Sequence, residues 1–147
     1  MPPEAATHLF NLLCELLPAG ATEATVRQRL KPLTTAASPV RRQLGRTYLT
    51  LGGGFFQLTA IFEGAARQLY QVTLRATPPA YVAIKTFART LPETADLPPA
   101  LTAEWRASWL GLVPQLLLRP TSGTASGVSV RFVGVLPTRK VIILTRL

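Results

Sequence analysis

The beginning of the chain separates polar from apolar side chains at helical spacing. Polar residues recur on one face, at Glu4, His8, Asn11 and Glu15. Apolar residues fill the opposite face, at Ala6, Leu9, Phe10, Leu13, Leu16 and Leu17. This periodicity predicts an amphipathic first helix, which Pro18 and Gly20 end. Thr22 is the expected N-cap of a second short helix that turns Val26 and Leu30 inward.

From Thr47 onward the period shortens toward two residues, and glycine and proline bound the apolar runs. The pattern predicts β-strands over residues 48–51, 55–62, 67–75 and 81–87. The glycine triplet 52–54 suits the hairpin turn between the first two strands. The alternate positions of the third strand form a basic, solvated face, which consists of Arg67, Leu69, Gln71, Thr73 and Arg75.

Farther along, an apolar stripe predicts a long helix over residues 100–118, kinked at Pro114. Its members are Leu101, Trp105, Trp109, Leu112 and Leu116. Residues 128–136 and 139–146 alternate as the strands of a closing hairpin. The expected fold class is α+β, with N-terminal helices, an antiparallel or mixed sheet of about five to six strands, and one long helix in the C-terminal half before a closing β-hairpin.

The length of 147 residues suits one hydrophobic core. We therefore expect a single α+β domain over residues 1–147. Residues 1–46 would form its helical region, and residues 47–147 would form the sheet with helix 100–118.

Both faces of the predicted closing hairpin are apolar. A loop at Pro137-Thr138 would place Leu136 opposite Arg139. One face would then collect Val130, Phe132, Leu136, Val141 and Ile143, and the other Val133, Val135, Ile142 and Leu144. A sheet with one solvated face would not expose the second set, so either a helix of this chain or a partner subunit covers it. Trp105 and Trp109 are further candidate partner contacts.

The supply of reactive side chains argues against an enzyme. The chain has one histidine, one cysteine and one aspartate, which are His8, Cys14 and Asp96. A metal site needs several such ligands, and Glu4 with His8 is better explained as a solvated helix face. A catalytic triad would have to combine His8 with Asp96, while Cys14 lies on the apolar side of its helix. The glycine triplet lacks the lysine of a phosphate-binding loop. We expect no catalysis, no metal and no cofactor.

The chain gives no sign of export or of a membrane span. Its first residues carry acids and no lysine or arginine, unlike a secretory leader. The longest uncharged stretch, residues 47–62, is interrupted by glycines and threonines. A single cysteine does not point to an oxidising compartment. We therefore expect a cytoplasmic location.

Positive charge is concentrated in two segments without acids. The formal net charge is +9, from 16 Lys and Arg against 7 Asp and Glu. Residues 24–62 carry Arg27, Arg29, Lys31, Arg41, Arg42 and Arg46. Residues 105–147 carry Arg106, Arg119, Arg131, Arg139, Lys140 and Arg146. The candidate contacts to an anionic partner are the first set together with Arg131, Lys140 and Arg146.

Three functions are compatible with these patterns. The leading hypothesis is a non-enzymatic assembly subunit that oligomerises or docks into a larger complex through apolar surface and meets an acidic partner with its arginines. The second is a nucleic-acid-binding module that contacts phosphates electrostatically, with Tyr48, Tyr81 and Phe55 as candidate stacking residues. The third is a pocket between helix and sheet that binds a small apolar or anionic ligand.

Overall fold

Two meanders of antiparallel strands, each preceded by a helix, build the fold. The computed structural model describes residues 3–93, 101–106, 113–120, 127–134 and 140–147. The elements are α1 (Pro3–Leu16), α2 (Glu23–Leu30), the 3-10 helix η1 (Lys31–Leu33), β1 (Ala36–Ala37), β2 (Arg41–Gln43), β3 (Arg46–Gly52), β4 (Phe56–Glu63), β5 (Gln68–Ala76), α3 (Pro78–Thr90), the 3-10 helix η2 (Leu91–Glu93), β6 (Leu101–Arg106), β7 (Gln115–Pro120), β8 (Val128–Val133) and β9 (Lys140–Arg146). The predicted α+β class is confirmed.

All of these strands belong to one sheet, in the order β1-β3-β4-β5-β9-β8-β7-β6, and β2 also pairs with β3. Every pairing is antiparallel. Strand β9 lies between β5 and β8 and thereby joins the two meanders. With nine strands in the described residues, the sheet is larger than the five to six predicted.

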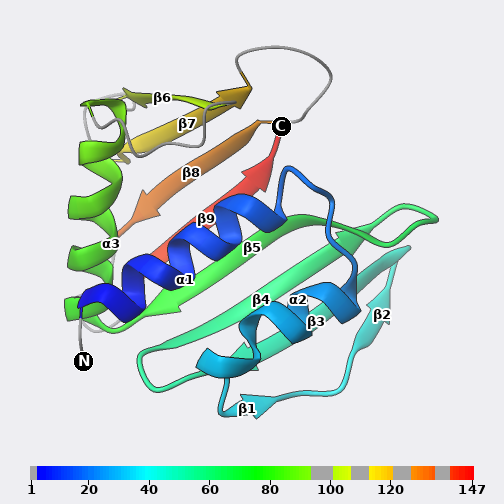
Figure 1. The fold of residues 1–147 in the computed structure, drawn as a ribbon. Helices are drawn as coiled ribbons and strands as arrows, with labels where there is room; N and C mark the ends of the chain where they lie inside the picture. Colours follow the sequence, from blue (N-terminus) through cyan, green and yellow to red (C-terminus); the bar gives the residue numbers. More distant parts are fainter. Residues whose placement is uncertain (1–2, 94–100, 107–112, 121–126, 135–139) are drawn as a thin grey trace.

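The hydrophobic core lies between one face of this sheet and the helices α1, α2 and α3 (Figure 1). Leu9, Phe10 and Leu13 of α1 are fully buried, as the helical periodicity predicts. The ring of Phe10 meets that of Phe87 from α3 edge-on, with centroids 6.1 Å apart. Thr22 caps α2 as predicted, because its side chain accepts a hydrogen bond from the backbone N–H of Thr25.

The predicted strand 81–87 is wrong, because these residues lie within helix α3. Pro78 and Pro79 occupy the first turn of the helix, where a missing N–H costs nothing. Tyr81, Ile84 and Ala88 are buried at helical spacing. The predicted helical region, residues 1–46, is also too long, since β1 and β2 follow η1.

The predicted helix 100–118 is wrong as well, because its described residues form the strands β6 and β7. Leu116 and Leu118 of β7 pair with Val130 and Val128 of β8 and are buried. Pairing with β8 thus decides the conformation, although leucine also favours helices. Trp105 lies in β6 opposite Leu116.

The closing hairpin is present, but its register differs by one residue from the prediction. Phe132 lies opposite Ile142, and Val133 lies opposite Val141. Such an offset moves one strand's side chains to the other face of the sheet. Ile142 and Leu144 therefore join Phe132 and Val130 beneath the helices, where all of them are fully buried.

Candidate anion-binding surface

The sheet face opposite the helices, here called the open face, carries the alternate residues of the strands. Among the described residues no helix lies on it (Figure 1). On β3, β4 and β5 its residues are Arg46, Tyr48, Thr50, Gln57, Thr59, Ile61, Glu63, Gln71, Thr73 and Arg75. On β9 and β8 they are Val141, Ile143, Thr145, Ser129, Arg131 and Val133. The face is therefore largely polar and cationic, with an aliphatic stripe over β9.

One row of the open face crosses the middle of the sheet. Thr50 lies opposite Thr59, which lies opposite Thr73. Across β9 the row continues through Ile143 to Arg131. Neighbouring strands are about 4.8 Å apart, so these side chains stand next to one another.

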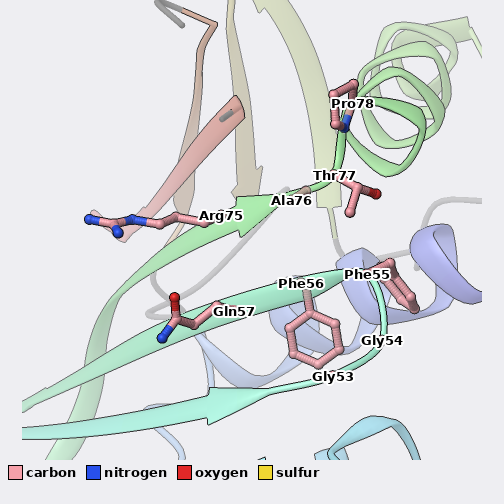
Figure 2. A pocket seen from close by; sticks show the side chains of 9 residues that line it. All are labelled: Gly53, Gly54, Phe55, Phe56, Gln57, Arg75, Ala76, Thr77 and Pro78. Atoms are coloured by element: carbon pink, nitrogen blue, oxygen red, sulfur yellow. The ribbon is translucent and has the colours of Figure 1, made fainter. Parts of the chain in front are cut away.

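Arg75 lies beside this row and takes part in two depressions of the surface. A small cavity of about 130 Å³ is lined by Thr50, Gln57, Thr59, Thr73 and Arg75. A larger one of about 350 Å³ reaches from Arg75 around the end of the sheet to residues 53–56 and 77–78 (Figure 2). Figure 2 shows Gln57 and Phe56 leaving β4 in opposite directions, with Arg75 projecting away from the turn at Gly53. The exposed Arg75 thus shares a small cavity with hydroxyl and amide side chains.

Gly53, the middle residue of the glycine triplet, serves packing at this end of the sheet, whereas a Cβ on Gly54 would meet nothing within 4 Å. A Cβ atom on Gly53 would lie 2.2 Å from the ring of Phe56 and 2.6 Å from the carbonyl oxygen of Leu33. Only glycine leaves room for that ring. Phe55 is half-buried, and its ring lies 5.1 Å from that of Phe56.

The arginines divide into paired and unpaired ones. Salt bridges join Arg27 to Glu23 at 3.3 Å and Arg29 to Glu15 at 2.8 Å. A third joins Arg106 to Glu104 at 3.0 Å, and this hydrogen bond lowers the pKa of Glu104. Within the described residues, the exposed side chains of Arg41, Arg42, Arg46, Arg75 and Arg131 form no salt bridge.

Three of the unpaired arginines belong to one hairpin, here called the arginine hairpin, which comprises β2, β3 and the turn between them. Arg41 pairs with Tyr48 and places its guanidinium carbon 5.7 Å from the centre of that ring. The turn residues Leu44 and Gly45 have φ angles of 52° and 76°. Leu44 is 94% exposed. Arg41 and Arg46 therefore extend the basic open face, Arg42 lies opposite the buried Thr47 on the other side of the sheet, and Leu44 forms an exposed apolar tip.

The predicted anionic contacts are only partly brought together. Arg41, Arg42 and Arg46 share the arginine hairpin, and Arg131 lies on the open face. Arg27 and Arg29 lie on α2, engaged by glutamates, and Lys31 follows them in η1.

Lys140 and Arg146 occupy the other side of the sheet. Lys140 donates a hydrogen bond to the carbonyl of Gly134. A guanidinium nitrogen of Arg146 lies 2.8 Å from the position that a Cβ on Gly20 would take.

The predicted partner contacts are also separated. Ile142 and Leu144 are fully buried in the core, so neither is available to a partner. Val133 is half-exposed on the open face. Trp105 is half-buried, with its ring 5.7 Å from that of Phe132. Trp109 and Val135 lie outside the described residues.

The alternation in residues 67–75 predicts that Arg75 belongs to a solvated basic face, but it does not predict which residues lie next to Arg75. Thr50, Gln57 and Thr59 lie on other strands, and only the register of β3, β4 and β5 brings them to Arg75. The alternation of polar and apolar residues in 55–62 was the available signal for Gln57 and Thr59.

Other site types have little support in the described residues. These residues contain no cluster of three His, Cys, Asp or Glu side chains that would hold a metal ion. Burial, with the nearby Glu15 carboxylate, raises the pKa of the Cys14 thiol far above its usual range, which suits an unreactive thiol. No helix in the described ranges is long and apolar enough to cross a membrane.

Comparisons with protein-family models, with curated proteins and with solved structures gave no match.

Proposed function

We propose that the protein is a non-enzymatic interaction subunit that docks an acidic protein partner on its open face, in the cytoplasm. The observation that carries this proposal is the pair of exposed arginines Arg75 and Arg131, which flank β9 and form no salt bridge within the described residues. A carboxylate of a partner would supply the bidentate acceptor that each guanidinium lacks.

The residues between these arginines suit a protein partner. Val141, Ile143 and Val133 form a half-exposed aliphatic stripe on β9 and β8. An apolar centre with arginine at its margin is a common composition of protein interfaces. Thr73 and Gln57 add neutral hydrogen-bonding groups next to Arg75.

The arginine hairpin enlarges the positive field at the edge of this face. Arg41, Arg42 and Arg46 carry three charges on one short ribbon. Such a field speeds the encounter with an acidic surface and depends on ionic strength. We assign the hairpin to steering and the Arg75–Arg131 region to docking.

The test compares two double variants with equal loss of charge. Arg75→Gln/Arg131→Gln removes the docking pair, and Arg27→Gln/Arg29→Gln removes two arginines that are engaged on α2. The probe is a short fluorescent peptide of alternating glutamate and leucine, followed by anisotropy. We expect the first variant to weaken binding about tenfold or more and the control to change it less than about twofold.

Equal weakening by both variants would mean that only net charge matters and would reject the open face as the docking site. The same titration with single-stranded RNA tests the nucleic-acid alternative, which the contact of Arg41 with Tyr48 favours. That alternative replaces the proposal if two results are found together. RNA must bind more tightly than the peptide, and Arg41→Gln/Arg42→Gln must weaken RNA binding more than Arg75→Gln/Arg131→Gln does.

A further inference from the structure

A cavity of about 460 Å³ is lined by residues of α3, of the end of β8 and of the start of β9. Figure 1 shows where these elements lie. Helix α3 contributes Tyr81 and Lys85, the end of β8 contributes Phe132 and Val133, Gly134 follows that strand, and the start of β9 contributes Lys140. We call it the lysine cavity. Its volume is in the range of small-molecule binding sites.

Two of the three lysines in the chain converge on this cavity. The ammonium nitrogen of Lys85 lies 6.0 Å from the centre of the Tyr81 ring, and that of Lys140 lies 5.8 Å from it. No carboxylate lines the cavity among the described residues. Lys140 donates one hydrogen bond, to the carbonyl of Gly134, and an ammonium group has two further N–H donors. Two cations that line one cavity, with no carboxylate beside them among the described residues, favour the binding of an anion.

Gly134 leaves a space between the hydroxyl of Tyr81 and the ammonium group of Lys140. A Cβ atom at this position would lie 3.3 Å from the Tyr81 hydroxyl and 3.4 Å from the ammonium nitrogen of Lys140. Both groups therefore point to one place at the rim of the cavity. Burial raises the pKa of Tyr81, which keeps the phenol protonated and able to donate a hydrogen bond.

The inner wall of the cavity is apolar. Phe132 is fully buried, and its ring meets that of Tyr81 edge-on at 6.1 Å. Val113 and Pro114 complete this wall. A bound molecule would therefore place a flat apolar body against Val113 and Pro114, over the buried ring of Phe132, and its charge beside the two lysines.

We propose that the lysine cavity binds a small aromatic phosphate monoester. The doubly charged phosphate matches the two ammonium groups and the Tyr81 hydroxyl, and the aromatic ring matches the apolar wall. Its two lysines and its tyrosine lie on the side of the sheet opposite the open face, although Val133 of the open face also lines the cavity.

Isothermal titration calorimetry of the full chain with phenyl phosphate tests this proposal. Inorganic phosphate and benzyl alcohol serve as half-ligands, because the first has only the phosphate and the second only the aromatic ring. We expect phenyl phosphate to bind at least about tenfold more tightly than either half-ligand. Lys85→Met and Lys140→Met keep the side-chain length and remove the charge, so each should weaken binding about tenfold or more. Lys31→Met removes the third lysine, outside the cavity, and should leave binding unchanged.

Gly134→Ala is the second decisive variant, since its methyl group would occupy the space between Tyr81 and Lys140 without changing the charge. We expect it to weaken phenyl phosphate binding while leaving the urea midpoint of unfolding close to that of the original chain. Three results would overturn the proposal: no saturable binding, equal affinity for inorganic phosphate, or an equal loss in Lys31→Met. If the methionine variants fail to fold, the Gly134→Ala result decides.

Discussion

At the scale of single residues, Leu44 is the least expected feature of the chain. It is 94% exposed and has a φ of 52°, in the left-handed region that costs a leucine about 1–2 kcal/mol. Gln43 and Arg46 pair on either side of Leu44 and Gly45, so the turn has two residues. Neither packing nor backbone preference explains a leucine here. Leu44 lies at the tip of the arginine hairpin, which carries three unpaired arginines. Its side chain is therefore available to a partner that binds this hairpin.

Leu44→Asn should stabilise the isolated protein. Asparagine enters the left-handed region readily, and Asn-Gly is the preferred sequence of such hairpin turns. We expect a gain of about 1 kcal/mol in the free energy of unfolding and a rise of about 2–4 °C in the melting temperature, measured by circular dichroism.

Leu44→Ala is the control, because alanine keeps the unfavourable φ and removes the exposed side chain. It should leave the melting temperature nearly unchanged. A rise as large as that of Leu44→Asn would show that the backbone conformation is not the cause.

At the scale of elements, β9 presents two chemically different faces within consecutive residues. Ile142 is fully buried beneath the helices, whereas Val141 is half-exposed on the open face. Both are aliphatic and β-branched. Their environments therefore follow from the register with β8 and β5 and not from residue type.

A matched pair of substitutions tests this register. Ile142→Lys would bury a charge that no partner compensates, a cost of several kcal/mol, and we expect an unfolded chain. Val141→Lys should change the free energy of unfolding by less than about 1 kcal/mol. Far-ultraviolet circular dichroism and urea unfolding measure both. A folded Ile142→Lys protein together with an unfolded Val141→Lys protein would reverse the assignment of faces.

Local patterns predict the elements that are stabilised mainly by their own sequence. The first helix, the capped second helix and the strands β3, β4, β5, β8 and β9 follow from periodicity, and the structure contains all of them. Periodicity does not predict the strands at residues 101–106 and 115–120. Their leucine and tryptophan residues recur at helical spacing, but these residue types also suit strands when β8 provides an edge to pair with. The neighbours of Arg75 were not predictable either, since they depend on the register between strands.

At the scale of the whole molecule, the two sides of the sheet differ in chemistry. The helix side holds the core, Cys14 and Tyr81, and the open face holds unpaired arginines among threonines and glutamines. The charged residues of the two proposed sites lie on different sides of the sheet, while Val133 lines both sites. Substitutions of the charged residues in one site should therefore act independently of those in the other.

The helix side also makes the global stability sensitive to alkaline pH. Burial raises the pKa of both Cys14 and Tyr81 in the folded protein. Above about pH 8.5 the unfolded chain releases the cysteine proton while the folded chain retains it. The unfolded state then binds fewer protons, so stability is complete below this pH and falls as the pH rises.

Urea unfolding between about pH 8 and about pH 10 measures this dependence. Cys14→Ala should show a shallower decline than the original chain over that interval. Identical declines would mean that the folded protein does not shield the thiol.

The central place of β9 has a consequence for biosynthesis. On the ribosome, β5 and β8 emerge before the strand that lies between them, so each meander displays one unpaired edge until β9 follows. The sheet is completed when β9 pairs with β5 on one side and with β8 on the other. The pairing of β5 with β9 joins residues that are far apart in the sequence, so we expect it to be slow. Until β9 pairs, the edges of β5 and β8 expose unpaired backbone groups. Chaperones would bind the nascent chain at these edges, and aggregation would begin there.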